Sequence, residues 1–219
     1  MNLPSLWLNL TLDRNRVYSK RFVYEHVLDE IVNAIRKSAN KMESIDEFPI
    51  ELMDQIIDDE TEVIEYLLGT AFVLCQAYIT DVVSTVMSLH EFADSKDISL
   101  KTTTNKKKDI LKFGYEGNSF SPVAVIDGFA NYFKHRDEWV FNWQKLPDRT
   151  QKIVEIIQSA GAKSGCTGNL RQGSITLGSP HFAETGIFLD KLEHWHLDLT
   201  DAYRTEFENV FTEESRNDQ

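Results

Sequence analysis

Residues 67–90 of this chain read LLGTAFVLCQAYITDVVSTVMSLH and contain one charged side chain, that of Asp81. Apolar residues cover nearly every face of a helix drawn through them, which predicts a buried helix at the centre of the fold. A carboxylate in the middle of a bilayer costs about 3 kcal/mol, so Asp81 argues against a membrane span. We therefore expect the core helix of a cytoplasmic protein that does not enter a membrane.

This central helix is expected over residues 59–92, because the acids 58–60 stand where a helix N-terminus favours negative charge. Apolar residues at helical spacing predict an amphipathic helix over residues 18–42, before the break at Pro49. Pro122 suits the first turn of a later helix. Further helices are predicted over residues 50–57, 122–139, 149–160 and from about 181 or 187 to 211.

Strand character is confined to two short segments, residues 7–12, which alternate, and residues 174–177, which lie in a glycine-rich loop. Five prolines and ten glycines are few for a many-turned β-fold. The sequence predicts an all-α fold, an antiparallel helical bundle around a long apolar central helix with at most a minor pair of short strands. It also predicts a single domain over residues 1–219, with a frayed polar tail from about 213 to 219.

The chain is acidic, with a net charge of −12 and a pI near 4.9. Long-range repulsion by such a charge disfavours nucleic acid except at a local basic patch, and it attracts basic proteins. Solubility is the alternative explanation for the acidity. The two cysteines, Cys75 and Cys166, form neither a disulfide framework nor a metal quartet, and we expect no cofactor.

Negative charge is densest in residues 43–65, which contain ten acids and no Lys or Arg. This segment is a candidate docking face for a basic protein, such as the active cleft of a nuclease toxin, because complementary charge speeds association. The alternative is a pair of solvated helix faces. Positive charge gathers at Lys106, Lys107 and Lys108, near Lys101 and Lys112, which form either a phosphate-contacting patch or a solvated loop.

Two further patterns predict no site. The acidic and histidine residues between 193 and 201 include His194 and His196, which diverge on a helix, so we expect no metal there. The loop 161–171 contains glycines and Lys163 but lacks the Gly-Lys-Ser/Thr of a P-loop, and a flexible connector is expected.

A polar stripe on the helix after Pro122 is the leading candidate site. Asp127, Asn131 and His135 recur every four residues and share one helical face. Asp or Asn can orient the imidazole, and His135 can then act as an acid or base near neutral pH. Lys134 and Arg136 flank it and can hold a phosphate. The alternative is that His135 caps the C-terminus of the helix beside a solvated charged face.

The segment ANYFKH, residues 130–135, resembles the signature of HEPN-domain proteins, which is Arg, a polar residue, three more residues and His. Asn131 and His135 match, whereas Ala130 replaces the arginine. The resemblance covers this short motif, and the long helices before it fit that family's bundle.

The resemblance implies a homodimer whose cleft cleaves RNA without a metal. His135 would be the acid or base, and Asn131 its polar companion. Ala130 cannot stabilise phosphate as the family's arginine does, and Arg136 lies about 100° away around the helix. An inactive relative that binds RNA or protein is therefore an equal alternative.

Two functions follow. The first is a HEPN-like protein that binds or cleaves RNA in a stress, toxin–antitoxin or defence setting, with Lys106, Lys107, Lys108 and Lys134 contacting RNA. The second is an acidic immunity protein or antitoxin that inhibits a basic toxin by direct binding.

Overall fold

The computed structural model describes residues 14–117, 119–139, 142–179 and 184–217. Every regular element in these ranges is helical, so the predicted all-α class is confirmed. The strand expected over residues 7–12 lies outside the described residues. The strand expected over residues 174–177 is wrong, because this segment ends the helix α7 (Asn169–Thr176).

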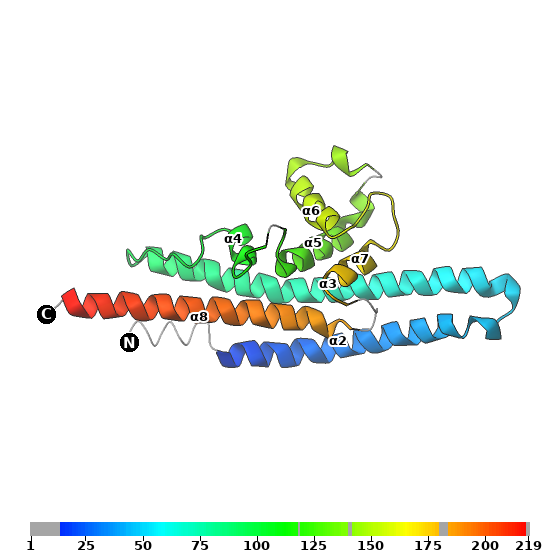
Figure 1. Ribbon diagram of the computed structural model, residues 1–219, viewed down its shortest axis with the longest axis horizontal. Helices are drawn as coiled ribbons and strands as arrows, with labels where there is room; N and C mark the ends of the chain where they lie inside the picture. Colours follow the sequence, from blue (N-terminus) through cyan, green and yellow to red (C-terminus); the bar gives the residue numbers. More distant parts are fainter. Residues whose placement is uncertain (1–13, 118, 140–141, 180–183, 218–219) are drawn as a thin grey trace.

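Three long helices make the body of the molecule, α2 (Arg14–Glu43), α3 (Ile50–Asp94) and α8 (Gly186–Asn217). Figure 1 shows α2 running antiparallel to α3, while α8 runs in the same direction as α3. Ring contacts along α3 and α8 agree, because Phe72 meets Phe188 and His90 meets Tyr203. Helix α8 continues to Asn217, and the fraying expected of residues 213–219 stays a prediction.

Helix α3 is one continuous helix, and the two separate helices predicted over residues 50–57 and 59–92 are wrong. The acids 58–60 resemble a helix start, but no proline or glycine stands between Ile50 and Val63 to end the helix. Asp58 and Asp59 instead lie on the exposed side of the helix. The chain reverses between α2 and α3 through the short 3₁₀ helix η1 (Ile45–Glu47), and Pro49 precedes α3.

The smaller helices pack together along α3 on the side away from α2 (Figure 1). They are α4 (Lys107–Lys112), α5 (Pro122–His135), η2 (Arg136–Glu138), η3 (Trp143–Lys145), α6 (Asp148–Ser159) and α7. Helix α5 was expected to end near Trp139 but ends at His135, where the tighter η2 begins. Arg136 therefore does not continue the α-helical face on which the motif was placed.

Three helices meet at Phe72 of α3. Its ring is stacked 5.3 Å from Phe129 of α5 and 4.9 Å from Phe188 of α8, as measured between ring centroids. One turn away, Gly69 lets α5 approach the backbone of α3. A Cβ at Gly69 would come within 2.1 Å of the Phe133 ring, so only glycine fits this contact.

Helix α3 is long and apolar enough by composition to cross a membrane, and half of its most apolar 18-residue window is buried inside the protein. Core helices of globular proteins meet the same criterion, so this composition alone does not place α3 in a membrane. The cytoplasmic location stays a prediction.

The Gly69→Ala variant tests the contact between α3 and α5. The added methyl group displaces the Phe133 ring, and we expect a loss of about 1–3 kcal/mol in the free energy of unfolding, despite the better helix propensity of alanine. Urea unfolding measures this loss. Gly186→Ala is the matched control, because no atom lies within 4 Å of its new methyl group. Equal stability of the two variants would contradict the packing described.

Candidate functional site

Asp127 and Asn131, the first two residues of the polar stripe, lie in the interface between α5 and α3. Asp127 is 8% exposed, and Gln76 Nε2 donates a hydrogen bond of 2.8 Å to its Oδ1. Asn131 Nδ2 donates to the backbone oxygen of Asp127 at 2.9 Å. These bonds satisfy polar groups that burial would otherwise leave unpaired. Asp127 thereby joins α5 to α3, whereas Asn131 bonds within α5.

Lys107 reaches the same carboxylate from α4, with Nζ 2.8 Å from Asp127 Oδ1. The charge of Asp127 is thereby balanced, and the start of α4 is fixed to the middle of α5. Lys107 is thus engaged within the protein, whereas Lys106, Lys108 and Lys134 are exposed and able to meet a ligand.

His135, the third residue of the stripe, is more exposed to solvent than the other two. Its side chain is half exposed, and its Nδ1 is 3.1 Å from Oε1 of Glu138, which is also exposed. The 3₁₀ turn of η2 brings Glu138 back to the imidazole. The pair can hold the ring orientation, as a carboxylate does for many functional histidines.

Ala130 is fully buried, with no exposed surface. The position at which the HEPN signature has its arginine therefore faces the core in this chain. A guanidinium there would need a buried partner, because an unpaired buried charge is strongly destabilising.

Arg136 packs against α3 instead of standing beside the stripe. Its guanidinium carbon is 4.1 Å from the ring centroid of Tyr66 and 4.9 Å from that of Phe133. Such cation–π contacts stabilise a side chain in place. The structure thus uses Arg136 to fasten the end of α5 to α3.

Glu65 occupies the N-terminus of α7, which follows the glycine-rich loop 161–168. Its carboxylate accepts hydrogen bonds from the backbone N–H groups of Arg171, at 3.2 Å, and Leu170, at 3.4 Å. An anion at a helix N-terminus is favoured by the helix dipole, and here the protein supplies it from α3. Burial raises the pKa of Glu65, and these hydrogen bonds oppose that rise. No sequence pattern predicts this role, because it joins residues more than a hundred positions apart.

Two buried histidines, His90 and His196, hold helices together in a way that no sequence pattern predicts. His196 Nδ1 is 2.9 Å from the Tyr78 hydroxyl, and His90 Nε2 is 2.9 Å from the Tyr203 hydroxyl, which is also bonded to Thr103 at 2.7 Å. Burial lowers the pKa of His90, and burial together with nearby Lys20 lowers that of His196 to about 4. Each pair links α3 to α8, and the imidazoles are neutral at pH 7.

The acids and histidines between residues 193 and 201 point in different directions on α8. His194 is exposed and 3.6 Å from Asp198, His196 faces α3, and Glu193 is paired with Arg21 of α2. Within the described residues, no group of three Cys, His, Asp or Glu side chains is arranged to hold a metal ion.

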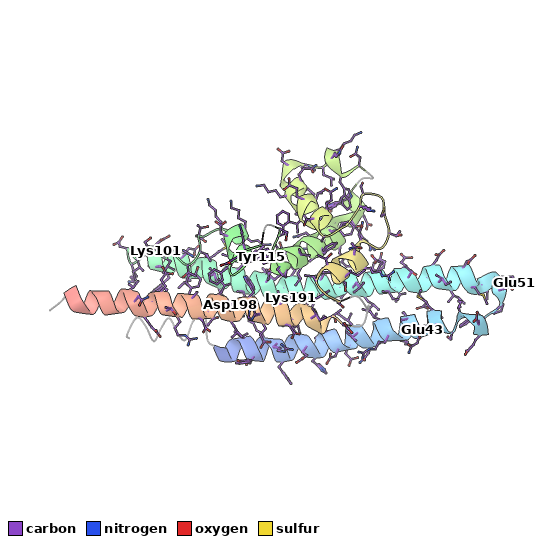
Figure 2. All side chains as sticks on the ribbon, in the orientation of Figure 1. Glu43, Glu51, Lys101, Tyr115, Lys191 and Asp198 are labelled. Carbon is purple, nitrogen blue, oxygen red and sulfur yellow. The ribbon has the colours of Figure 1, made fainter. Side chains whose placement is uncertain are left out.

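The end of the α2–α3 hairpin, residues 43–63, forms the most acidic surface of the described chain. Figure 1 shows the hairpin extending beyond the other helices, and Figure 2 places Glu43 and Glu51 at its far end. Eight of its acids are exposed, namely Glu43, Asp46, Glu47, Glu51, Asp54, Asp58, Asp59 and Glu62. Apolar side chains are exposed among them, with Ile50 75% and Leu52 46% exposed.

No protein-family model matches the chain, and neither a curated protein nor a solved structure is significantly similar to it. The resemblance to HEPN proteins therefore rests on the motif residues alone.

The Tyr78–His196 pair predicts a specific pH dependence of stability. The unfolded chain protonates His196 near its ordinary pKa of 6.5, whereas the folded chain does so only near 4. Protons therefore favour unfolding in this window, so the stabilisation is complete above about pH 6.5 and is lost as the pH falls toward 4.

We expect the wild type to lose about 2–3 kcal/mol more between pH 7 and pH 4 than His196→Gln, which keeps a hydrogen-bonding group but does not titrate. Chemical unfolding at several pH values measures the difference. Parallel curves for the two proteins would show that His196 is not held neutral.

Proposed function

We propose that this protein binds a basic protein partner through the end of the α2–α3 hairpin and that binding, rather than catalysis, is its function. The observation that carries the proposal is a protruding helical end that combines eight exposed acids with exposed apolar side chains. Acidic groups attract and orient a basic partner, and apolar groups supply contact area once it has arrived.

The positions of the charges support this assignment. Residues 43–65 contain no Lys or Arg, and Lys41 at the base of the segment is paired with Glu60. Most of the acids are therefore not neutralised within the segment and can act on a partner. Lys101 lies toward the opposite end of the molecule, far from these acids (Figure 2).

The nature of the surface favours an amphipathic partner. Ile50, Leu52, Ile57 and Val63 are all more than a third exposed on the first turns of α3. Ile50 and Ile57 are seven residues apart and share one face of α3. A basic helix with one apolar face would cover these two side chains and place its Lys and Arg residues near the surrounding acids. Inhibition of a basic toxin is one function that such binding would serve.

Neutralising the hairpin end tests the proposal. We expect the triple variant Asp54→Asn, Asp58→Asn, Asp59→Asn to bind a basic amphipathic helical peptide at least about tenfold more weakly, chiefly through a slower on-rate at low salt. Stopped-flow fluorescence over a range of salt concentrations measures the rate. Ile50→Asn should instead accelerate dissociation, since it removes apolar contact.

The matched control is the triple variant Glu116→Gln, Asp137→Asn, Glu155→Gln, which removes the same charge from exposed positions elsewhere. If both triple variants slow association equally, the rate depends only on the net charge of the protein, and the hairpin end is not the docking surface.

RNA binding is a second candidate, and it is favoured by the exposed His135–Glu138 pair. The exposed Lys134 adjoins this pair. Lys108 is exposed on α4, which packs against α5, and Lys106 is exposed immediately before α4. His135 could act on a ribose 2′-OH if a second protomer supplied a cation, as the homodimer implied by the HEPN resemblance would require. Buried Ala130 favours binding over cleavage.

RNA assays with His135→Ala test this candidate. If His135 is an acid or base, its loss should reduce cleavage by about a hundredfold or more. His194→Ala, another exposed histidine, is the control. Lys106→Gln with Lys108→Gln should reduce the salt dependence of RNA binding by about two counterions, whereas Lys145→Gln with Lys152→Gln should not. Equal activity of all variants would exclude RNA as the ligand of this surface.

A further inference from the structure

A cavity of about 490 Å³ lies between α2, α3 and α8, away from the hairpin end and from the motif on α5. This volume is within the range of sites that hold small organic molecules. Its lining combines apolar and hydrogen-bonding groups from the three long helices. The lining residues are Ser19, Lys20, Val23, Tyr24, Asp81, Val82, Thr85 and His196.

His196 is the most deeply placed polar group of this lining, since it is only 3% exposed. Its Nδ1 is bonded to the Tyr78 hydroxyl, and the two rings are nearly perpendicular, at 85°. The ring of His196 lines the cavity, and because Nδ1 is engaged by Tyr78, Nε2 is the ring nitrogen left to pair with a ligand.

The charges at the cavity cancel one another. Lys20 forms an ion pair with Asp81 across the mouth, and its Nζ lies 5.5 Å from the centroid of the Tyr78 ring. On the adjoining surface, Arg21 is paired with Glu193 and with Asp190. The imidazole of His196 is neutral at pH 7, so the deep part of the cavity offers hydrogen bonding without net charge.

We propose that this cavity binds a small uncharged molecule with an apolar, ring-sized body and a hydrogen-bonding group that pairs with His196 Nε2. Val23, Tyr24 and Val82 provide apolar contact for the body, and Ser19 and Thr85 provide hydroxyl groups nearer the rim. A charged ligand is disfavoured, because Lys20 and Asp81 are already paired with each other and the neutral imidazole of His196 offers no opposite charge. Tyr78 is a positioning residue, since its hydroxyl is hydrogen-bonded to Nδ1 and holds the orientation of the imidazole.

A series of four probes of similar size tests the class of ligand, and it consists of phenol, toluene, benzoate and benzylammonium. Titration at pH 7, followed by the ¹⁵N resonances of the His196 ring, should show saturable binding of phenol with a shift of Nε2. Toluene lacks the hydroxyl group and should bind about tenfold more weakly, and the two charged probes should bind more weakly still.

Variants locate the binding in this cavity. His196→Gln should retain phenol binding in part, whereas His196→Phe should abolish the preference for phenol over toluene. Because a substitution at a buried position can prevent folding, Thr85→Leu provides a second test by narrowing the rim, with Thr61→Leu on the exposed surface of α3 as the control. Equal binding of phenol and toluene, tighter binding of a charged probe, or equal binding by the two threonine variants would overturn the proposal.

Discussion

Burial of α3 on several faces is the constraint on which the rest of the structure depends. All of its buried residues lie between Ile64 and Ala93, and there α2, α5 and α8 are all needed to cover it. Before Ile64, the helix has no buried residue and extends with α2 as a two-helix hairpin. One continuous helix thus belongs to a packed core along most of its length and to an exposed arm at its start.

The central helix could be predicted because a long run without charge has few other stable arrangements in a globular protein. The true beginning of this helix could not be predicted, since acids such as Asp58 and Asp59 suit an exposed helix face as well as a helix N-terminus. The absence of proline and glycine between Ile50 and Val63 was the better sign that the helix begins at Ile50. Residues 174–177 were too few for periodicity to separate strand from helix, and the cap of α7, Glu65, comes from a distant part of the chain.

The polar stripe shows that spacing alone can place residues on one helical face but cannot tell which of them are exposed. Asp127, Asn131 and His135 do recur at helical spacing on α5, but burial divides them between a helix interface and the surface. The partner that makes Asp127 structural is Gln76, which is 51 residues away in sequence. No local pattern predicts such a contact, nor the Tyr78–His196 pair. The divergence of His194 and His196 was predictable, because it follows from helix geometry itself.

The residues proposed to bind a partner and the residues that hold the helices together lie in different parts of this molecule. At the hairpin end, the exposed acids and apolar side chains contribute no buried surface, so selection for a partner can alter them at little cost to the fold. On α5 and at its end the opposite holds, because Asp127 and Arg136 each make a contact that fixes one helix to another. A new activity is therefore more easily acquired on the hairpin than on the stripe. The cavity beside the Tyr78–His196 pair stands between these cases, since the imidazole that joins α3 to α8 through Nδ1 also lines the cavity.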